Sequence, residues 1–537
     1  MNKARLLYLT AGIIFIASCD QVSKVKKKFI HQDTTINTIT SYNNLFLDSL
    51  QVESFIASHK DLEKYKDQFF DFYKHRNYEF AWFDTSGLIE QAHNFYNLQN
   101  DYITQQKDSS IYSVTLNKLY DSLNAQSALA NKSKTGLTLQ TELLLTGQFF
   151  AYASKVYQGS DINAADLGWF IPRKKIDISA TLDTLIKNKG AANVLYEPLN
   201  KQYRLLEKYL VKYYDLETKD TWDSIPAGIS LKKGDSSVTV RLIKQRLFEL
   251  GDLNSADSTN IYDTLLLAAV KHFQKRVGLP ESGLIGSGTF KELNVRPADR
   301  VQQLLVNMER SRWMLPDTLK SDYLLVNIPE FKLHVYQDGK EDFNMNCVVG
   351  TAANSTVIFS GNLKYIVFNP YWNVPSGILQ KEVLPGMKRN PNYLASHNME
   401  VTGYSGKTPI VRQKSGSNNS LGLVKFLFPN NYDIYLHDTP NKDLFSLSGR
   451  AFSHGCIRLS EPAKLAQFLL RRDSLWTMDS VKNSMNGGKE KWITLKQPVP
   501  VTIGYFTAWV NADGDLNFRK DIYGHDKKMA EKLFVKK

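Results

Sequence analysis

A cysteine and two histidines late in the chain are of the residue types that nucleophilic catalysis needs. Cys456 directly follows His454 and Gly455, and His437 ends an apolar run earlier in the chain. A thiol attacks as its thiolate, and with a pKa of about 8.5 an ordinary cysteine is only slightly ionised at neutral pH. An imidazole that takes the thiol proton and returns it to a leaving amine removes this barrier. Spacing alone favours His454, because side chains two residues apart share one face of a strand, although a turn at Gly455 would separate them.

Two further residues fit the same chemistry. Gly455 permits a close backbone approach, so that amides near Cys456 face a developing oxyanion. Arg458 can hold a substrate carboxylate through two parallel hydrogen bonds. A zinc site of His437, His454 and Cys456 is an alternative, but it needs a fourth ligand or a water. The sequence has no second cluster of metal ligands, so we expect a nucleophile and no metal.

The first 19 residues have the pattern of a signal peptide. Lys3 and Arg5 precede an apolar stretch from Leu6 to Ala17, which is too short to span a bilayer alone. The ending at Ser18 and Cys19 resembles a bacterial lipobox, and this resemblance implies a lipidated Cys19 at the mature N-terminus. We therefore expect a membrane-anchored lipoprotein in the cell envelope, facing the periplasm. An ordinary signal peptide or an uncleaved anchor is the alternative.

Cys347, the remaining cysteine, lies in an apolar run and is expected to be a small buried residue on a strand.

The charge of the chain limits the classes of partner that it can bind. The formal net charge is +13 and the pI about 9.2, which is compatible with an anionic membrane or polymer. The basic residues are scattered and no nucleic-acid motif is present, so we expect no nucleic-acid partner.

Helical periodicity dominates residues 45–225, after a polar tether at 20–44. Apolar residues repeat at helical spacing over 138–157, which is followed by Gly159, and again over 198–214. Aromatic residues are abundant here and are expected to form a core. We predict a helical scaffold domain for 45–225, without a catalytic cluster of its own.

Three short helices are predicted for residues 226–296. The first ends at Gly251, the second runs from Leu265 to Val277, and the third begins near Ser287. This segment resembles the peptidoglycan-binding module family in the stretches Gln245-Arg246-Leu247, Ala269 to Gln274, and Gly283 to Gly286. The resemblance implies glycan binding; a helical spacer that binds no glycan is the alternative.

Residues 297–537 change to a mainly β pattern. A helix is expected over 299–313, and a second one over 462–471. The apolar or alternating runs of strand length are 323–328, 331–336, 344–349, 364–369, 433–436 and 499–505. An insert at about 376–410 lacks strand rhythm and reads as a lid or binding element. The chain is thus predicted to be an α+β multidomain protein.

The region from 307 onward resembles the catalytic domain of the L,D-transpeptidase family, in the large branch that also has a helical scaffold and a peptidoglycan-binding module. The motifs that carry the resemblance are Asn307 to Arg310, Val326 to Pro329, Asn369 to Pro375, Asn419 to Gly422, His437 to Pro440, and Ser453-His454-Gly455-Cys456 with Arg458. The family shows Thr-Pro and Pro-Gly where this chain has Thr356-Val357 and Ser415-Gly416. These departures affect loops rather than the catalytic residues.

The resemblance implies a role for each matching residue. Cys456 is the nucleophile and His437, rather than His454, is the general base and acid. The resemblance assigns supporting roles to His454 and Gly455 at the turn and oxyanion site, to Asp438 as a backbone partner of His437, and to Ser453 and Arg458 on the substrate side. The insert at 376–410 corresponds to a capping element.

The implied reaction is a 3→3 cross-link between peptidoglycan stem peptides, with release of D-Ala from a tetrapeptide through a cysteinyl thioester. Water as acceptor would give an L,D-carboxypeptidase, and a lipoprotein lysine would give a protein-anchoring enzyme. No cofactor is needed, and carbapenem-type inhibitors are expected to acylate the site. A non-catalytic wall-binding lipoprotein and a secreted thiol hydrolase are the alternatives from other classes.

Overall fold

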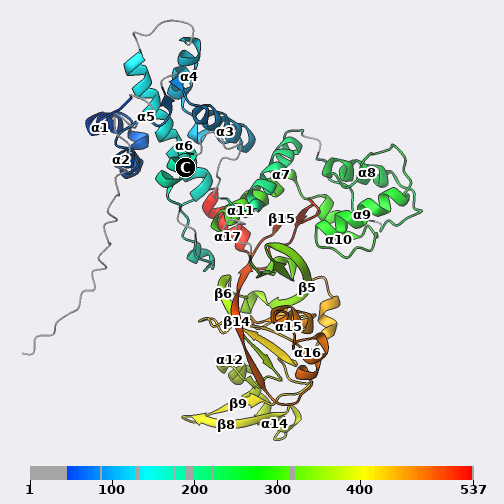
Figure 1. Cartoon of the computed structure of the whole chain (residues 1–537). Coiled ribbons are helices and arrows are strands. Elements are labelled where there is room, and N and C mark those ends of the chain that lie inside the picture. The colour runs from blue at the N-terminus through cyan, green and yellow to red at the C-terminus, as the bar shows by residue number, and fades with distance from the viewer. Residues whose placement is uncertain are drawn as a thin grey trace, which may run out of the picture.

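The computed structural model describes residues 45–84, 87–126, 134–173, 176–187, 199–219, 222–228, 230–314 and 321–534. The predicted signal peptide, the tether and the lipidated Cys19 lie outside these residues. Within them, every helix is too short or too polar to cross a bilayer. The predicted α+β multidomain architecture is confirmed. A helical region, a three-helix module and a mainly β region form three lobes of the molecule (Figure 1).

The helical region is built on a dense aromatic core. Its seven α-helices are α1 (Ser49–Ser58), α2 (Lys66–His75), α3 (Glu90–Gln106), α4 (Val114–Gln126), α5 (Lys134–Ala153), α6 (Ile178–Lys187) and α7 (Lys201–Thr218). The buried carboxylate of Glu142 accepts hydrogen bonds from the main-chain amides of Ala81 and Trp82 and from the Tyr73 hydroxyl, at 2.7–2.9 Å. Burial raises the Glu142 pKa to about 7. The aromatic side chains here are core, as expected from the sequence.

This helical core continues into segments that are distant in sequence. Helix α11 (Pro297–Trp313) contributes Leu304 and Met308, and the hairpin of β15 (Ala508–Val510) and β16 (Leu516–Phe518) supplies four more buried residues. The Gln202 side chain exchanges two hydrogen bonds of 2.8 and 2.9 Å with the backbone of Val510. The C-terminal hairpin is therefore an integral part of the helical region.

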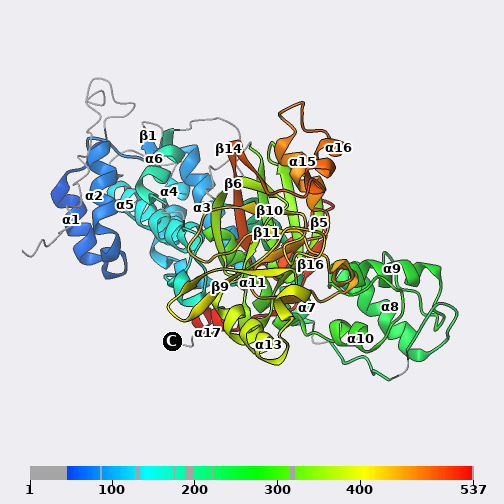
Figure 2. The same ribbon diagram turned by 90° about the horizontal axis from the view of Figure 1, so that it is seen from below.

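The three-helix module has its own core between α8 (Val238–Leu250), α9 (Thr264–Arg276) and α10 (Ser287–Leu293). Helix α8 ends where the sequence predicts, because Gly251 adopts a left-handed conformation with φ +85°. Arg276 fastens the module to the hairpin by donating to the Leu516 carbonyl at 2.7 Å. The module and helices α1–α6 lie on opposite sides of α7 and α11, beyond the same end of the β region (Figures 1 and 2).

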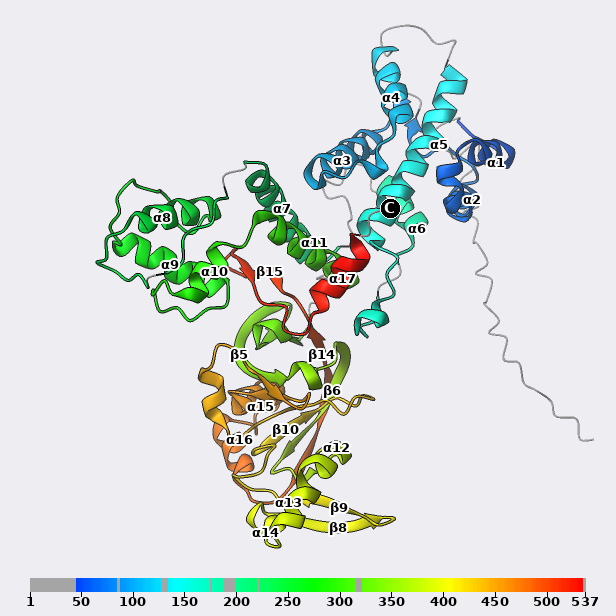
Figure 3. The ribbon, with the colours of Figure 1, turned by 180° about the vertical axis from the view of Figure 1, so that it is seen from behind.

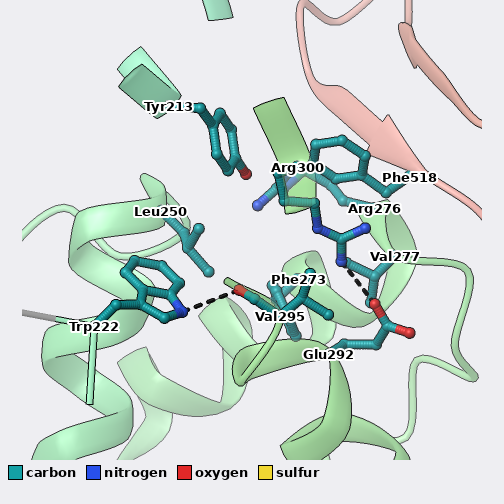
Figure 4. A pocket seen from close by; sticks show the side chains of 10 residues that line it. All are labelled: Tyr213, Trp222, Leu250, Phe273, Arg276, Val277, Glu292, Val295, Arg300 and Phe518. Atoms are coloured by element: carbon teal, nitrogen blue, oxygen red, sulfur yellow. Dashed lines mark hydrogen bonds and ion pairs between the residues drawn. The ribbon is translucent and has the colours of Figure 1, made fainter. Parts of the chain in front are cut away.

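A cavity of about 10 Å³ lies where the module meets α7, α11 and β16 (Figure 4). Arg300 pairs with Glu292 at 2.7 Å, and the Trp222 indole donates to the Val295 carbonyl at 3.0 Å. The lining is made of apolar side chains and paired ions, so this cavity is part of a packed junction.

The β region is a nine-stranded sheet in the order β12-β5-β13-β11-β10-β6-β14-β3-β4. Its strands are β3 (Tyr323–Asn327), β4 (Lys332–Gln337), β5 (Lys340–Gly350), β6 (Phe359–Phe368), β10 (Val424–Leu427), β11 (Leu436–His437), β12 (Ala451–Ser453), β13 (Ile457–Leu459) and β14 (Lys491–Gly504). The first half of β5 pairs with β4 and its last residues pair with β13, so the sheet curls back on itself. Cys347 is a fully buried residue of β5, as predicted.

Helices flank the sheet, and an insert caps one end. α15 (Pro462–Leu470) and α16 (Met478–Met485) pack against each other, and α17 (His525–Leu533) closes the described chain. In the insert, β7 (Trp372–Asn373), β9 (Thr408–Gln413) and β8 (Met399–Ser405) form a separate sheet, which lies at the end of the molecule away from the scaffold helices (Figure 3). The sequence did not indicate these strands, because β8 is largely exposed and lacks apolar alternation.

Candidate active site

The pairing of two short strands brings the predicted catalytic residues together. β11 and β13 are parallel, with Leu436 opposite Ile457 and His437 opposite Arg458. Cys456 stands directly before β13, and the Ile457 amide donates to the Tyr435 carbonyl at 3.1 Å. Since side chains alternate along strands, Tyr435, His437, Cys456 and Arg458 project from one face of the sheet.

His437 is held in one orientation and one protonation state. Its Nδ1 lies 2.5 Å from the carbonyl oxygen of Asp438. A carbonyl can only accept, so Nδ1 carries the proton of the neutral ring, and the Leu421 carbonyl, which also acts to raise the pKa, is a second backbone partner of the ring. Burial, reinforced by the Arg458 cation, lowers the His437 pKa to about 3. The imidazole is therefore neutral at physiological pH.

The Cys456 thiol lies between an acceptor and several donors. Sγ donates to the Asp433 carbonyl at 3.5 Å. Burial raises the Cys456 pKa, while the main-chain amide and the hydroxyl of Tyr435, followed by the Arg458 cation, act in the opposite direction. The Tyr435 hydroxyl in turn interacts with the Trp372 indole of the capping insert. Asp433 thus stabilises the thiol, and Tyr435 and Arg458 would stabilise the thiolate.

Cys456 and His437 form no hydrogen bond with each other among the residues that the structure describes. The thiol pairs with Asp433 and the imidazole with Asp438. Both titrating groups are shifted toward their neutral forms. The two groups therefore do not form a thiolate–imidazolium ion pair.

The turn before the nucleophile is closed by a serine hydroxyl. Ser453 Oγ donates to the Cys456 carbonyl at 2.5 Å and accepts from the Gly455 amide at 3.1 Å. Gly455 has φ +117°, a conformation that favours glycine. The Gly455 amide is engaged in this turn, whereas the Cys456 amide has no hydrogen-bond partner among the described residues.

A threonine from the loop after β5 also holds this turn through hydrogen bonds. Thr356 Oγ1 donates to the Gly455 carbonyl at 2.8 Å and accepts from the Gly350 amide at 2.9 Å. The Tyr523 hydroxyl donates to the Gly350 carbonyl at 2.6 Å. Thr356 belongs to one of the two family departures, and its hydroxyl is fully used in positioning the turn.

Asp438 organises the loop beside His437. Its carboxylate accepts from the Leu423 amide at 2.9 Å and from Lys442 Nζ at 2.5 Å. Gly422 has φ +61°, and a Cβ there would lie 2.4 Å from the Asp438 Cγ atom. The carboxylate therefore holds the neighbouring loop, while the Asp438 carbonyl orients the imidazole.

His454 is directed away from the thiol. Its Nε2 lies 3.1 Å from Glu382 Oε1 in the capping insert, and its side chain is 53% exposed. The three candidate zinc ligands consequently do not converge, and no metal-type cluster of three His, Cys, Asp or Glu residues occurs in the described part of the chain. His454 connects the nucleophile turn to the insert.

Arg458 carries an unsatisfied donor next to the catalytic pair. Its Nε is buried without a hydrogen-bond partner among the described residues. Burial lowers the Arg458 pKa, while the neighbouring Cys456 acts in the opposite direction. A buried unpaired donor is costly, so this nitrogen stands out among the groups around Cys456.

Sequence reasoning missed two of these residues. Tyr435 lies two positions before His437, so a strand ending at His437 places both on one face, and this signal was available. Thr356 contacts Gly455 from 99 positions away, and no local pattern in the sequence reveals that contact.

Three parts of the chain match models of known protein families. Residues 321–500 match the L,D-transpeptidase catalytic domain, 67–210 the Scaffold domain, and 236–293 the "Putative peptidoglycan binding domain". The chain carries an L,D-transpeptidase catalytic domain. The L,D-transpeptidase domain spans the sheet, the capping insert and the Cys456 turn.

Curated and solved relatives are similar over part of the chain. A "Putative L,D-transpeptidase" of Haemophilus influenzae is 34% identical over 260 residues, which is 45% of this chain. The matched part spans 50% of that relative's length. Solved L,D-transpeptidases from Xylanimonas cellulosilytica and Stackebrandtia nassauensis are 15% and 18% identical, each over 52% of this chain and 99% and 97% of theirs, with TM-scores of 0.18 and 0.21. L,D-transpeptidase 3 of Mycobacterium tuberculosis, solved with a faropenem-derived adduct, is 16% identical over 34% of this chain and 60% of its own, with a TM-score of 0.18.

Proposed function

We propose that the chain is a peptidoglycan L,D-transpeptidase that acts through a Cys456 thioester. The observation that supports this most directly is the common face of Tyr435, His437 and Cys456 on β11 and β13, with Nδ1 of His437 locked onto Asp438. This arrangement leaves Nε2 as the base for the thiol. The family match of the surrounding sheet supports the same reaction class.

The reaction proceeds in two balanced steps. Cys456 sulfur attacks the carbonyl between the third stem residue and D-Ala, while His437 takes the thiol proton and passes it to the departing amine. The C–N bond breaks as the C–S bond forms. An amine from a second stem then attacks the thioester, the C–S bond breaks, and the amine proton returns through His437 to the thiolate. The Cys456 amide faces the oxyanion and Arg458 holds the donor stem.

The test is incubation of the full chain with disaccharide tetrapeptide, followed by mass spectrometry of the products. We expect dimers with loss of D-Ala, and we expect Cys456→Ala and His437→Ala to abolish them. Cys347→Ala, which removes a buried cysteine of β5, is the control that retains turnover. Tripeptide alone would identify a carboxypeptidase, and no turnover together with no carbapenem adduct would refute the enzymatic proposal.

We further propose that the protein is retained at the membrane by lipidated Cys19 and bound to the wall by the three-helix module. The sequence of residues 1–19 and the family match of residues 236–293 support these two contacts. Cys19→Ser should move the protein from the membrane to the soluble envelope fraction. Deleting the module should reduce sedimentation with isolated wall sacculi.

A further inference from the structure

A short segment between α5 and α6 leaves the scaffold helices and joins the catalytic core. It descends toward the start of β6 (Figures 1 and 3). Trp169 is buried against Trp313 and Phe506, with ring centroids 5.5 and 5.9 Å apart. Trp169 also forms a parallel β-bridge with Ile358, and the Phe170 amide donates to the Ile358 carbonyl at 2.8 Å. The scaffold therefore extends the edge of the catalytic sheet.

The first route from this segment to the nucleophile runs through the backbone. Ile358 is two residues from Thr356, whose hydroxyl bridges Gly350 and Gly455. A shift of Ile358 moves Thr356, and with it the carbonyl of the residue that precedes Cys456. The Phe170 amide is thus linked to the nucleophile turn by a continuous series of short contacts.

The second route runs through aromatic rings. The Phe170 ring lies 5.5 Å from that of Tyr432, which in turn lies 4.9 Å from Phe359 at the start of β6. Tyr432 directly precedes Asp433, the residue whose carbonyl accepts the Cys456 thiol and whose φ is +53°. Phe170 therefore packs on the loop that sets the position of the thiol acceptor.

We propose that Phe170 of the scaffold is a positioning residue of the active site, whose ring fixes the Asp433 carbonyl through Tyr432 while its main-chain amide ties the segment to Ile358 and, in every variant tested, keeps that tie. The inference rests on the proposed function for its role in turnover, but thiol geometry can be measured without it. The scaffold then supplies part of the catalytic geometry in addition to carrying the domain.

The exposure of the two rings separates positioning from stability. Phe170 is 43% exposed and Tyr432 is 39% exposed, so truncating either ring removes little buried apolar area. A small displacement of the Cys456 sulfur, in contrast, lowers kcat strongly. Truncating a residue that served folding alone would lower stability strongly and the rate of turnover little.

The test compares Phe170→Ala, Phe170→Tyr, Tyr432→Ala and the double alanine variant in the full chain. The readout is the rate of iodoacetamide alkylation at Cys456, resolved by peptide mass spectrometry from the other cysteines, together with kcat and KM. We expect both alanine variants to lose about tenfold in kcat at similar KM, and to be alkylated faster at Cys456, because the Asp433 carbonyl that stabilises the neutral thiol is displaced. We expect Phe170→Tyr to match the wild type and the double variant to lose no more than either single one. Tyr112→Ala, which truncates an exposed aromatic residue elsewhere in the helical region, is the matched control.

Wild-type alkylation and kcat in Phe170→Ala would overturn the proposal, and so would additive losses in the double variant. If Phe170→Ala unfolds, Tyr432→Ala and Phe170→Tyr decide alone: loss of kcat in the first and retention in the second support the proposal, and any other result overturns it. If the wild type makes no cross-links but alkylation still depends on Phe170, the proposed function fails and the positioning role stands.

Discussion

Thr356 Oγ1 donates to the carbonyl oxygen of Gly455 at 2.8 Å, so the turn that precedes Cys456 is held by the loop after the neighbouring strand β5. The same oxygen accepts from the Gly350 amide, and Thr356 is only 1% exposed. One hydroxyl therefore satisfies two buried backbone groups, one on β5 and one in the turn before Cys456.

Replacing Thr356 by valine should lower stability and thiol reactivity together. The change keeps the shape but leaves the Gly350 amide buried without an acceptor, which costs about 1–3 kcal/mol. We expect a lower Tm by circular dichroism and slower alkylation of Cys456. Thr356→Ser retains the hydroxyl and should retain both properties. Equal behaviour of the valine and serine variants would contradict this role.

The pH dependence of Cys456 reactivity should be that of a neutral thiol. Burial raises its pKa, and the His437 pKa lies at about 3, so both groups are uncharged near pH 7. The ordinary pKa of a cysteine thiol is about 8.5. The thiolate fraction of Cys456, and with it the alkylation rate, should keep rising above that pH. Stopped-flow alkylation between pH 5 and about 10 measures this. A rate that is constant from pH 5 to about 8 would instead indicate an ion pair.

Arg458→Met should shift both titrations upward. The guanidinium lowers the pKa of Cys456 and that of His437, because a nearby cation favours the thiolate and disfavours the imidazolium. The alkylation profile should move to higher pH, and the imidazole resonances of His437 should titrate at higher pH in NMR spectra. Arg458→Lys keeps the charge and should move less. An unchanged thiol profile in Arg458→Met would rule out the electrostatic role.

Gly422→Ala should be far more damaging than an equivalent change at Gly406. Both glycines have φ +61°, so each alanine pays a similar backbone cost of about 1–2 kcal/mol. At Gly422 the new Cβ would also lie 2.4 Å from the Asp438 Cγ atom, whereas at Gly406 nothing lies within 4 Å. We expect Gly422→Ala alone to displace Asp438 and to reduce turnover. Urea unfolding and turnover assays measure both variants. Equal losses in Gly422→Ala and Gly406→Ala would show that the contact with Asp438 has no effect.

Much of the fold could be predicted because its signals are local. Helix α8 stops at Gly251, whose left-handed conformation is a standard end signal. The run of 323–328 appears as β3 because it alternates between buried and partly exposed positions. The strand predicted over 433–436 is shorter and begins later, at Leu436–His437, because Asp433 takes a positive φ and offers its carbonyl to the thiol.

The parts that could not be predicted depend on long-range contacts. The position of His454 against Glu382 follows from the fold of the capping insert and not from its spacing to Cys456. The partnership of Phe170 and Tyr432 joins segments that no sequence pattern relates. The motif around Cys456 indicates the chemistry, but the residues that support the turn and the thiol come from separate stretches of the chain, among them Thr356, Asp433 and Tyr523.

The shared core of α7, α11 and the β15–β16 hairpin has a consequence for how the protein is made. In the exported protein that we propose, residues 45–216 cross the membrane before the hairpin that covers part of their apolar surface. The helical region then keeps an open face until the end of the catalytic domain has followed, and the two complete folding together. A chain truncated after β14 would lack this last closure, and its N-terminal half would be the part that aggregates.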